Sequence, residues 1–167
     1  MKQKRKSTII LGIDPGFERI GIAVIERKLQ EKDNLLYSAC FKTKASFPFH
    51  ERLAQIGREM DNLIQEYKPN ALAIEKLYFT TNAKTVMGVA EARGVIVYNA
   101  SINDLDVFEY TPPQIKVAVT GYGKADKKMV GNMVPKLIKM NTVRTSDDEL
   151  DAIAIALTCL ACERFSF

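Results

Sequence analysis

The chain has 167 residues, of which 47% are hydrophobic and 26% charged, and its formal net charge is +4. This composition is typical of a soluble globular protein, and no apolar run approaches the length of a membrane span, so we expect no membrane partner. Three cysteines and no secretory signal favour a reducing, cytoplasmic location. The mild positive charge permits nucleic-acid binding without demonstrating it. We expect a basic tail over 1–7 and a single domain over 8–167.

The first half of the chain predicts four strands and one helix. Short apolar runs bounded by turn residues indicate strands over 8–14, 20–26 and 35–43, and the first two strands form a hairpin. Apolar residues at helical spacing predict a helix that includes 53–67. A further apolar run over 71–75 fits a central strand, because strands buried on both faces are continuously apolar.

The second half predicts mainly helices. A helix is expected over 81–100, and its small residues would let another backbone come close; a strand follows over 107–110. After a glycine-rich basic turn over 121–128, a helix contains Pro135, which lacks a backbone donor and should kink or delay it. The last helix opens at 146 or 147 and runs to about 161. The order of elements predicts an α/β protein with a mixed sheet covered by helices.

Four acidic residues stand in apolar surroundings, at strand ends or at the start of the last helix: Asp14, Glu75, Asp148 and Asp151. An unpaired carboxylate in an apolar setting is costly, and two like charges about 4 Å apart repel by roughly 4 kcal/mol at an effective dielectric near 20. A helix N-terminus tolerates acids, so capping could explain one or two of them but not those at the strand ends. Divalent cations are the natural counter-charge, and oxygen ligands favour Mg²⁺ or Mn²⁺.

Two metals held about 3.5–4 Å apart can activate a water and stabilise the leaving oxygen of a phosphodiester. Such a site needs three or four carboxylates and open positions for substrate and water. The acidic quartet therefore favours metal-dependent phosphodiester hydrolysis.

An ordered set of motifs extends through the chain. They are Leu11-Gly-Ile-Asp-Pro-Gly16, 21–24, 73–75 with Asn82, 92–95, Tyr110 with 114–117, 121–123 and 148–156. The first motif alone is weak, because actin-like ATPases and sugar kinases also begin with a Gly-Ile-Asp strand, but the ordered set is specific. On these residues the sequence resembles the RuvC family of Holliday-junction resolvases over nearly its whole length.

The resemblance implies an RNase H-like fold of the retroviral-integrase superfamily, with a five-stranded mixed sheet flanked by helices. It implies that Asp14, Glu75, Asp148 and Asp151 are both catalytic residues and metal ligands, with two Mg²⁺ ions per active site and Mn²⁺ as a substitute. Asp147 and Glu149 offer further carboxylates beside Asp148, so the sequence does not decide among those three. No other cofactor is implied.

The resemblance also assigns basic and aromatic residues. Lys116 and Lys127 match catalytic positions near the scissile phosphate, where an ammonium offsets developing charge. Tyr78 matches an aromatic residue that stacks on a base at the junction centre, and Asn82, Lys124 and Lys128 are expected to contact DNA.

The implied partners are a four-way DNA junction, a second copy of the chain and the RuvAB branch-migration complex. The helix over 81–100 matches the dimer-forming helix of the family. A two-fold dimer supplies two equivalent sites for two symmetric cuts. The implied location is the bacterial cytosol, in association with the nucleoid.

The sequence therefore predicts a structure-selective DNA endonuclease that makes paired nicks in four-way junctions during recombination and repair. One alternative is the YqgF-like branch of the same fold, linked to RNA processing, although 92–94 and Tyr78 argue against it. Another is a non-catalytic junction-binding protein, which the intact acidic quartet disfavours. An actin-like ATPase would need a second glycine-rich phosphate-binding strand and a longer chain.

Overall fold

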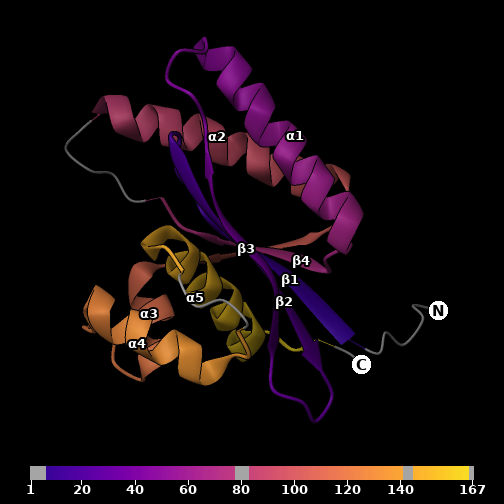
Figure 1. The fold of residues 1–167 in the computed structure, drawn as a ribbon, viewed down its shortest axis with the longest axis vertical. Helices are drawn as coiled ribbons and strands as arrows, with labels where there is room; N and C mark the ends of the chain where they lie inside the picture. The colour runs from indigo at the N-terminus through magenta and orange to yellow at the C-terminus, as the bar shows by residue number, and fades with distance from the viewer. Residues whose placement is uncertain (1–6, 78–82, 141–144, 166–167) are drawn as a thin grey trace.

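The computed structural model describes residues 7–77, 83–140 and 145–165. Its centre is a five-stranded sheet in the order β3-β2-β1-β4-β5 (Figure 1). The antiparallel part contains β1 (Ser7–Asp14), β2 (Arg19–Lys28) and β3 (Asn34–Lys42), whereas β4 (Ala71–Glu75) and β5 (Asp106–Tyr110) run parallel to β1. The predicted mixed sheet of five strands is thereby confirmed.

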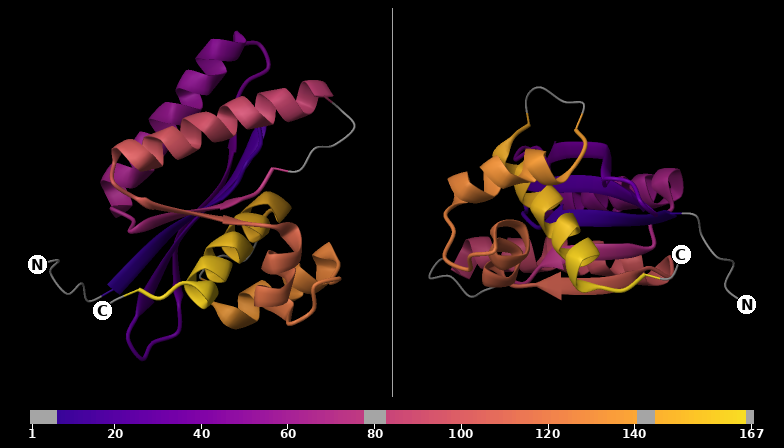
Figure 2. Two further views of the ribbon diagram at one scale, coloured as in Figure 1. Left: turned by 180° about the vertical axis from the view of Figure 1, so that it is seen from behind. Right: turned by 90° about the horizontal axis from the view of Figure 1, so that it is seen from below.

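Helices cover both faces of this sheet (Figures 1 and 2). One face packs against α1 (Phe49–Tyr67) and α2 (Ala83–Ile102). The other packs against α5 (Asp147–Cys162), beside which lie α3 (Pro112–Thr120) and α4 (Lys127–Leu137). The two faces therefore carry separate apolar cores.

Side-chain alternation along the strands determines which core each residue enters. On β1, Ile10 packs in the core on the α5 side, whereas Leu11 and Ile13 pack with α1 and α2. Helix α5 is buried along its central turns, from Ala152 to Leu160, because it crosses the middle strands. Its mixture of alanine, isoleucine and leucine reflects this burial.

Two helices differ from the sequence-based expectation. Helix α3 was not predicted as a separate element, yet Thr111 and Gln114 form a capping box at its start and proline occupies its first turn. Helix α4 begins at Lys127 without delay, where Asp126 caps it, and Pro135 lies within its last turn. Pro135 therefore does not delay the start of this helix, which ends two residues after it, and the alternative expectation of a kink stays a prediction.

Some expectations fall outside the described residues. Tyr78 and Asn82 belong to the segment 78–82, and most of the predicted basic tail also lies outside the described ranges. The division into a tail and one domain stays a prediction. Among the helices of the described residues, none combines the length and apolar character needed to cross a membrane.

Candidate active site

The ends of β1 and β4 place two of the predicted acids at one edge of the sheet. The parallel register pairs Ile13 with Ile74, so Asp14 and Glu75, the next residues, leave the sheet side by side. Both belong to the face that packs against α5, two residues beyond Gly12 and Ala73. The first two turns of α5 lie over this edge and carry the other two predicted acids, Asp148 and Asp151.

Close contact of α5 with the sheet depends on two glycines. A Cβ atom added to Gly12 would lie 2.5 Å from the carbonyl oxygen of Ala152, and one added to Gly21 would lie 2.0 Å from that of Asp148. Gly21 pairs with Asp14 across the β1–β2 hairpin. The bare backbone at Gly21 therefore lets the start of α5 approach Asp14.

The electrostatics of Asp14 show that the four acids share one environment. Burial raises its pKa from 3.8 to about 7, with further increases from the negative charges of Asp151, Glu75 and Asp148. Burial and the charge of Asp151 also raise the pKa of Glu75, and the positive charge of Lys116 opposes this increase. At Asp14, the negative charges of the three neighbouring acids therefore outweigh the positive charge of Lys127.

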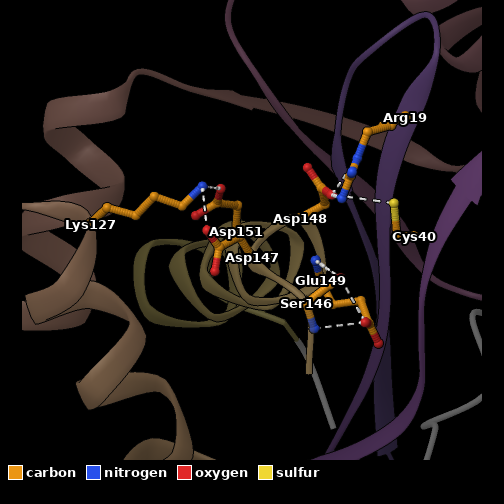
Figure 3. A network of polar contacts seen from close by, with 8 residues as sticks. All are labelled: Arg19, Cys40, Lys127, Ser146, Asp147, Asp148, Glu149 and Asp151. Atoms are coloured by element: carbon orange, nitrogen blue, oxygen red, sulfur yellow. Dashed lines mark hydrogen bonds and ion pairs between the residues drawn. The ribbon is translucent and has the colours of Figure 1, made fainter. Parts of the chain in front are cut away.

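Two cations bind the acids on α5 (Figure 3). Lys127 Nζ lies 2.9 Å from Asp151 Oδ2 and 3.7 Å from Asp147 Oδ2. Arg19 donates to Asp148 Oδ2 through Nε at 2.9 Å and also through Nη2, and the thiol of Cys40 lies 3.2 Å from the same oxygen.

Glu149 has a different role from its neighbours. Its carboxylate accepts hydrogen bonds from the backbone N–H of Ser146 at 2.9 Å, the Ser146 hydroxyl at 2.7 Å and the Ser38 hydroxyl at 2.7 Å. Desolvation alone would raise the pKa of Glu149, but the bonds from Ser146 and Ser38 lower it. Glu149 is therefore occupied as a capping residue, and the side chain of Asp147 is 76% exposed, against 23% for Asp148. This arrangement favours Asp148 over both neighbours as a ligand.

All four carboxylates are hard oxygen donors that suit a divalent cation such as Mg²⁺ or Mn²⁺. Within the described ranges, no group of three acidic, histidine or cysteine side chains is arranged to chelate an ion directly. Arg19 and Lys127 instead supply the positive charge beside Asp148 and Asp151. Asp14 is partly buried and has no hydrogen bond or ion pair with the other described residues, which best fits a cation ligand because desolvation and repulsion both oppose its ionised form.

The remaining predicted residues differ in their placement. Lys116 on α3 is half-buried and close enough to Glu75 to affect its titration. Lys124 and Lys128 are exposed on the connection before α4 and on its first turn. Tyr78 and Asn82 lie outside the described part of the chain, so their predicted roles are untested.

Sequence reasoning did not identify Arg19 and Cys40. The β2–β3 register pairs Gly21 with Cys40, and Arg19 precedes Gly21 by two residues on the same face. Since Gly21 also pairs with Asp14, alternation on the predicted hairpin could have placed Arg19 on the acidic face. Cys40 needed the register of a third strand, which the sequence alone did not give.

Comparisons with known proteins agree with this architecture. A family model described as "Crossover junction endodeoxyribonuclease RuvC" matches residues 10–159. A RuvC from Alkaliphilus oremlandii is 44% identical over 149 residues, which cover 89% of this chain and 90% of that protein.

Solved structures give the same result. The RuvC of T. thermophilus in complex with a Holliday junction substrate has a TM-score of 0.86 and 30% identity, covering 92% of this chain and 93% of that one. A yeast mitochondrial Holliday junction resolvase has a TM-score of 0.70 at 14% identity, covering 96% and 80%, which supports the fold alone. The chain therefore belongs to the RuvC family of crossover junction endodeoxyribonucleases.

Proposed function

We propose that this protein is a metal-dependent, structure-selective endonuclease that resolves four-way DNA junctions by paired symmetric nicks. The observation that carries the proposal is the partly buried carboxylate of Asp14, whose pKa is raised to about 7 by desolvation and by three neighbouring acids. A resident divalent cation relieves both causes. The family relationship gives the class of substrate on which such a site acts.

In this proposal Asp14, Glu75, Asp148 and Asp151 hold Mg²⁺, for which Mn²⁺ can substitute, and two ions occupy each site. Bound metal supplies Lewis acidity and a hydroxide nucleophile for phosphodiester hydrolysis. The protein contributes oxygen donors at the end of the sheet and at the start of α5, which approaches the sheet closely at Gly12 and Gly21.

Lys127 and Lys116 provide the positive charge near the reacting phosphate. Lys127 is paired with Asp151 at 2.9 Å, and its side chain is 59% exposed, so its ammonium is able to turn toward DNA once Asp151 binds a cation. Lys116 lies on the Glu75 side of the site. A fixed ammonium at either position stabilises charge that develops on the phosphoryl oxygens.

DNA contacts outside the acidic centre are expected from Lys124 and Lys128, which are exposed beside α4, and from Tyr78 and Asn82. Phosphate contacts provide affinity, and the shape of the junction provides selectivity.

Two equivalent cuts require two sites, which we propose a homodimer supplies through α2. Its exposed Met87, Tyr98 and Ile102 are large apolar side chains that favour burial against a second copy. We also propose that the dimer acts with the RuvAB branch-migration complex in the bacterial cytosol, near the nucleoid.

Asp14→Asn tests the catalytic role of the site without removing its shape. We expect the variant to bind a four-way junction with nearly unchanged affinity and to lose Mg²⁺-dependent cutting. Linear duplex DNA is the control substrate, and a structured RNA tests the YqgF-like alternative. A variant that still cuts would remove Asp14 from the metal site, whereas wild-type protein that binds junctions and never cuts would favour a binding module.

A further inference from the structure

The carboxylate of Asp148 is bound asymmetrically. Arg19 Nε, Arg19 Nη2 and the thiol of Cys40 all donate to Oδ2, and Oδ1 accepts no hydrogen bond from the described residues. In Figure 3 the second oxygen of Asp148 points away from Arg19 and Cys40. One oxygen is therefore fixed by the protein, and the other is open.

Three different elements impose this arrangement. Arg19 begins β2, Cys40 lies on β3 opposite Gly21, and Asp148 lies in the first turn of α5, where its backbone contacts Gly21. The side chain of Asp148 is only 23% exposed, whereas that of Arg19 is 55% exposed. The arginine thus reaches from the rim of the sheet over a carboxylate whose backbone is already fixed.

We propose that Arg19 is a positioning residue for metal binding, which together with Cys40 holds Asp148 by Oδ2 and presents Oδ1 to the cation. The inference rests on the proposed function, in which Asp148 is a ligand. It assigns Arg19 a role in orienting a ligand and not a contact with the reacting phosphate.

Two effects of Arg19 on metal affinity oppose each other. Its hydrogen bonds restrict the rotamers of Asp148, and outer partners of metal ligands typically contribute about 10- to 100-fold in affinity. Its positive charge repels a bound cation, but the side chain of Arg19 is 55% exposed and solvent screens this repulsion. Orientation therefore outweighs repulsion, and removal of Arg19 weakens metal binding.

The test is titration calorimetry of Mn²⁺ into the full chain without DNA at pH 7.5, with thermal melting as a check of folding. We expect Arg19→Ala to bind Mn²⁺ about 10-fold more weakly than wild type, and Arg19→Lys, which keeps the charge but loses the two-nitrogen contact, to fall between them. Lys28→Ala is the matched control. It removes the same charge from the other end of β2, where Lys28 is 49% exposed, and should leave affinity unchanged.

The outcomes separate this inference from the metal site itself. Unchanged or tighter Mn²⁺ binding by a folded Arg19→Ala would overturn the positioning role and leave the metal site intact. If wild-type protein binds no Mn²⁺, or binds it no more tightly than Asp14→Asn does, both the metal site and the positioning role would be overturned. If Arg19→Ala does not fold, Cys40→Ala replaces it, with an expected loss of about 3-fold and an unchanged affinity counting against the proposal.

Discussion

Asp14 makes the metal-free protein less stable at neutral pH than it would be with an uncharged residue there. Its pKa is raised from 3.8 to about 7, chiefly by burial and then by the charges of Asp151, Glu75 and Asp148. The folded state therefore binds this proton more tightly than the unfolded chain. Below pH 3.8 the group is protonated in both states, and folding is unaffected. As the pH rises toward 7 the unfolded chain ionises first, so stability is lost.

The difference between 3.8 and about 7 corresponds to roughly 4 kcal/mol of unfolding free energy at a pH well above 7. An asparagine retains a buried polar group but no charge, so it recovers most of this cost. We expect Asp14→Asn to be about 2–4 kcal/mol more stable than wild type at pH 8 in EDTA, and nearly equal to it at pH 4.

Urea unfolding at equal protein concentration measures this difference at both pH values. Asp61→Asn, which changes an exposed aspartate on α1, controls for the chemical change itself. Saturating Mn²⁺ should reduce the advantage of Asp14→Asn at pH 8, because metal bound only to the folded wild type stabilises it. Equal unfolding free energies for wild type and Asp14→Asn at pH 8 in EDTA would refute the reasoning.

Three further predictions concern the same site. Gly21→Ala would place a Cβ 2.0 Å from the Asp148 carbonyl oxygen, so the variant should lose about 1–3 kcal/mol of unfolding free energy in urea and bind Mn²⁺ more weakly. Gly131→Ala is the control, because its added Cβ would meet its nearest neighbour at 3.6 Å and should not destabilise the fold. A Gly21→Ala variant with wild-type stability and Mn²⁺ affinity would contradict the packing argument. Lys127→Gln should slow single-turnover junction cutting by about 10²- to 10³-fold, and a wild-type rate would exclude Lys127 from the reaction. Lys136→Gln, which changes an exposed lysine in the last turn of the same helix, is the control. Junction affinity should fall with salt by about 0.9 log unit per log salt for each neutralised phosphate, measured by gel shift; a flat response would contradict an electrostatic groove.

The sheet and the acidic residues were predictable because local patterns encode them. Apolar runs ending in Asp14 and Glu75 indicate strands, and a serine followed by acids indicates the start of α5. Helix α3 was missed, although Thr111 and Gln114 are a local capping signal, because a short helix between a strand and a glycine-rich turn has little periodicity.

The cations of the site were harder to predict because they depend on tertiary register. Arg19 and Asp148 are separated by 129 positions in the sequence, and their contact requires both the β1–β2 pairing and the docking of α5. The different roles of Asp148 and Glu149 likewise follow from Ser38, a β3 residue that only the folded chain brings to α5. Motif matching predicted that Lys127 lies near the reacting phosphate but did not predict its pairing with Asp151.

Cleavage of a mobile four-way junction tests the central claim most directly. Each of two opposite strands is labelled in turn, and the products are mapped with Mg²⁺ and with EDTA. The account predicts nicks at symmetric positions on both strands, with 5′-phosphate ends, only in Mg²⁺ and only in the junction. Equal cutting in EDTA, or equal cutting of linear duplex, would contradict it.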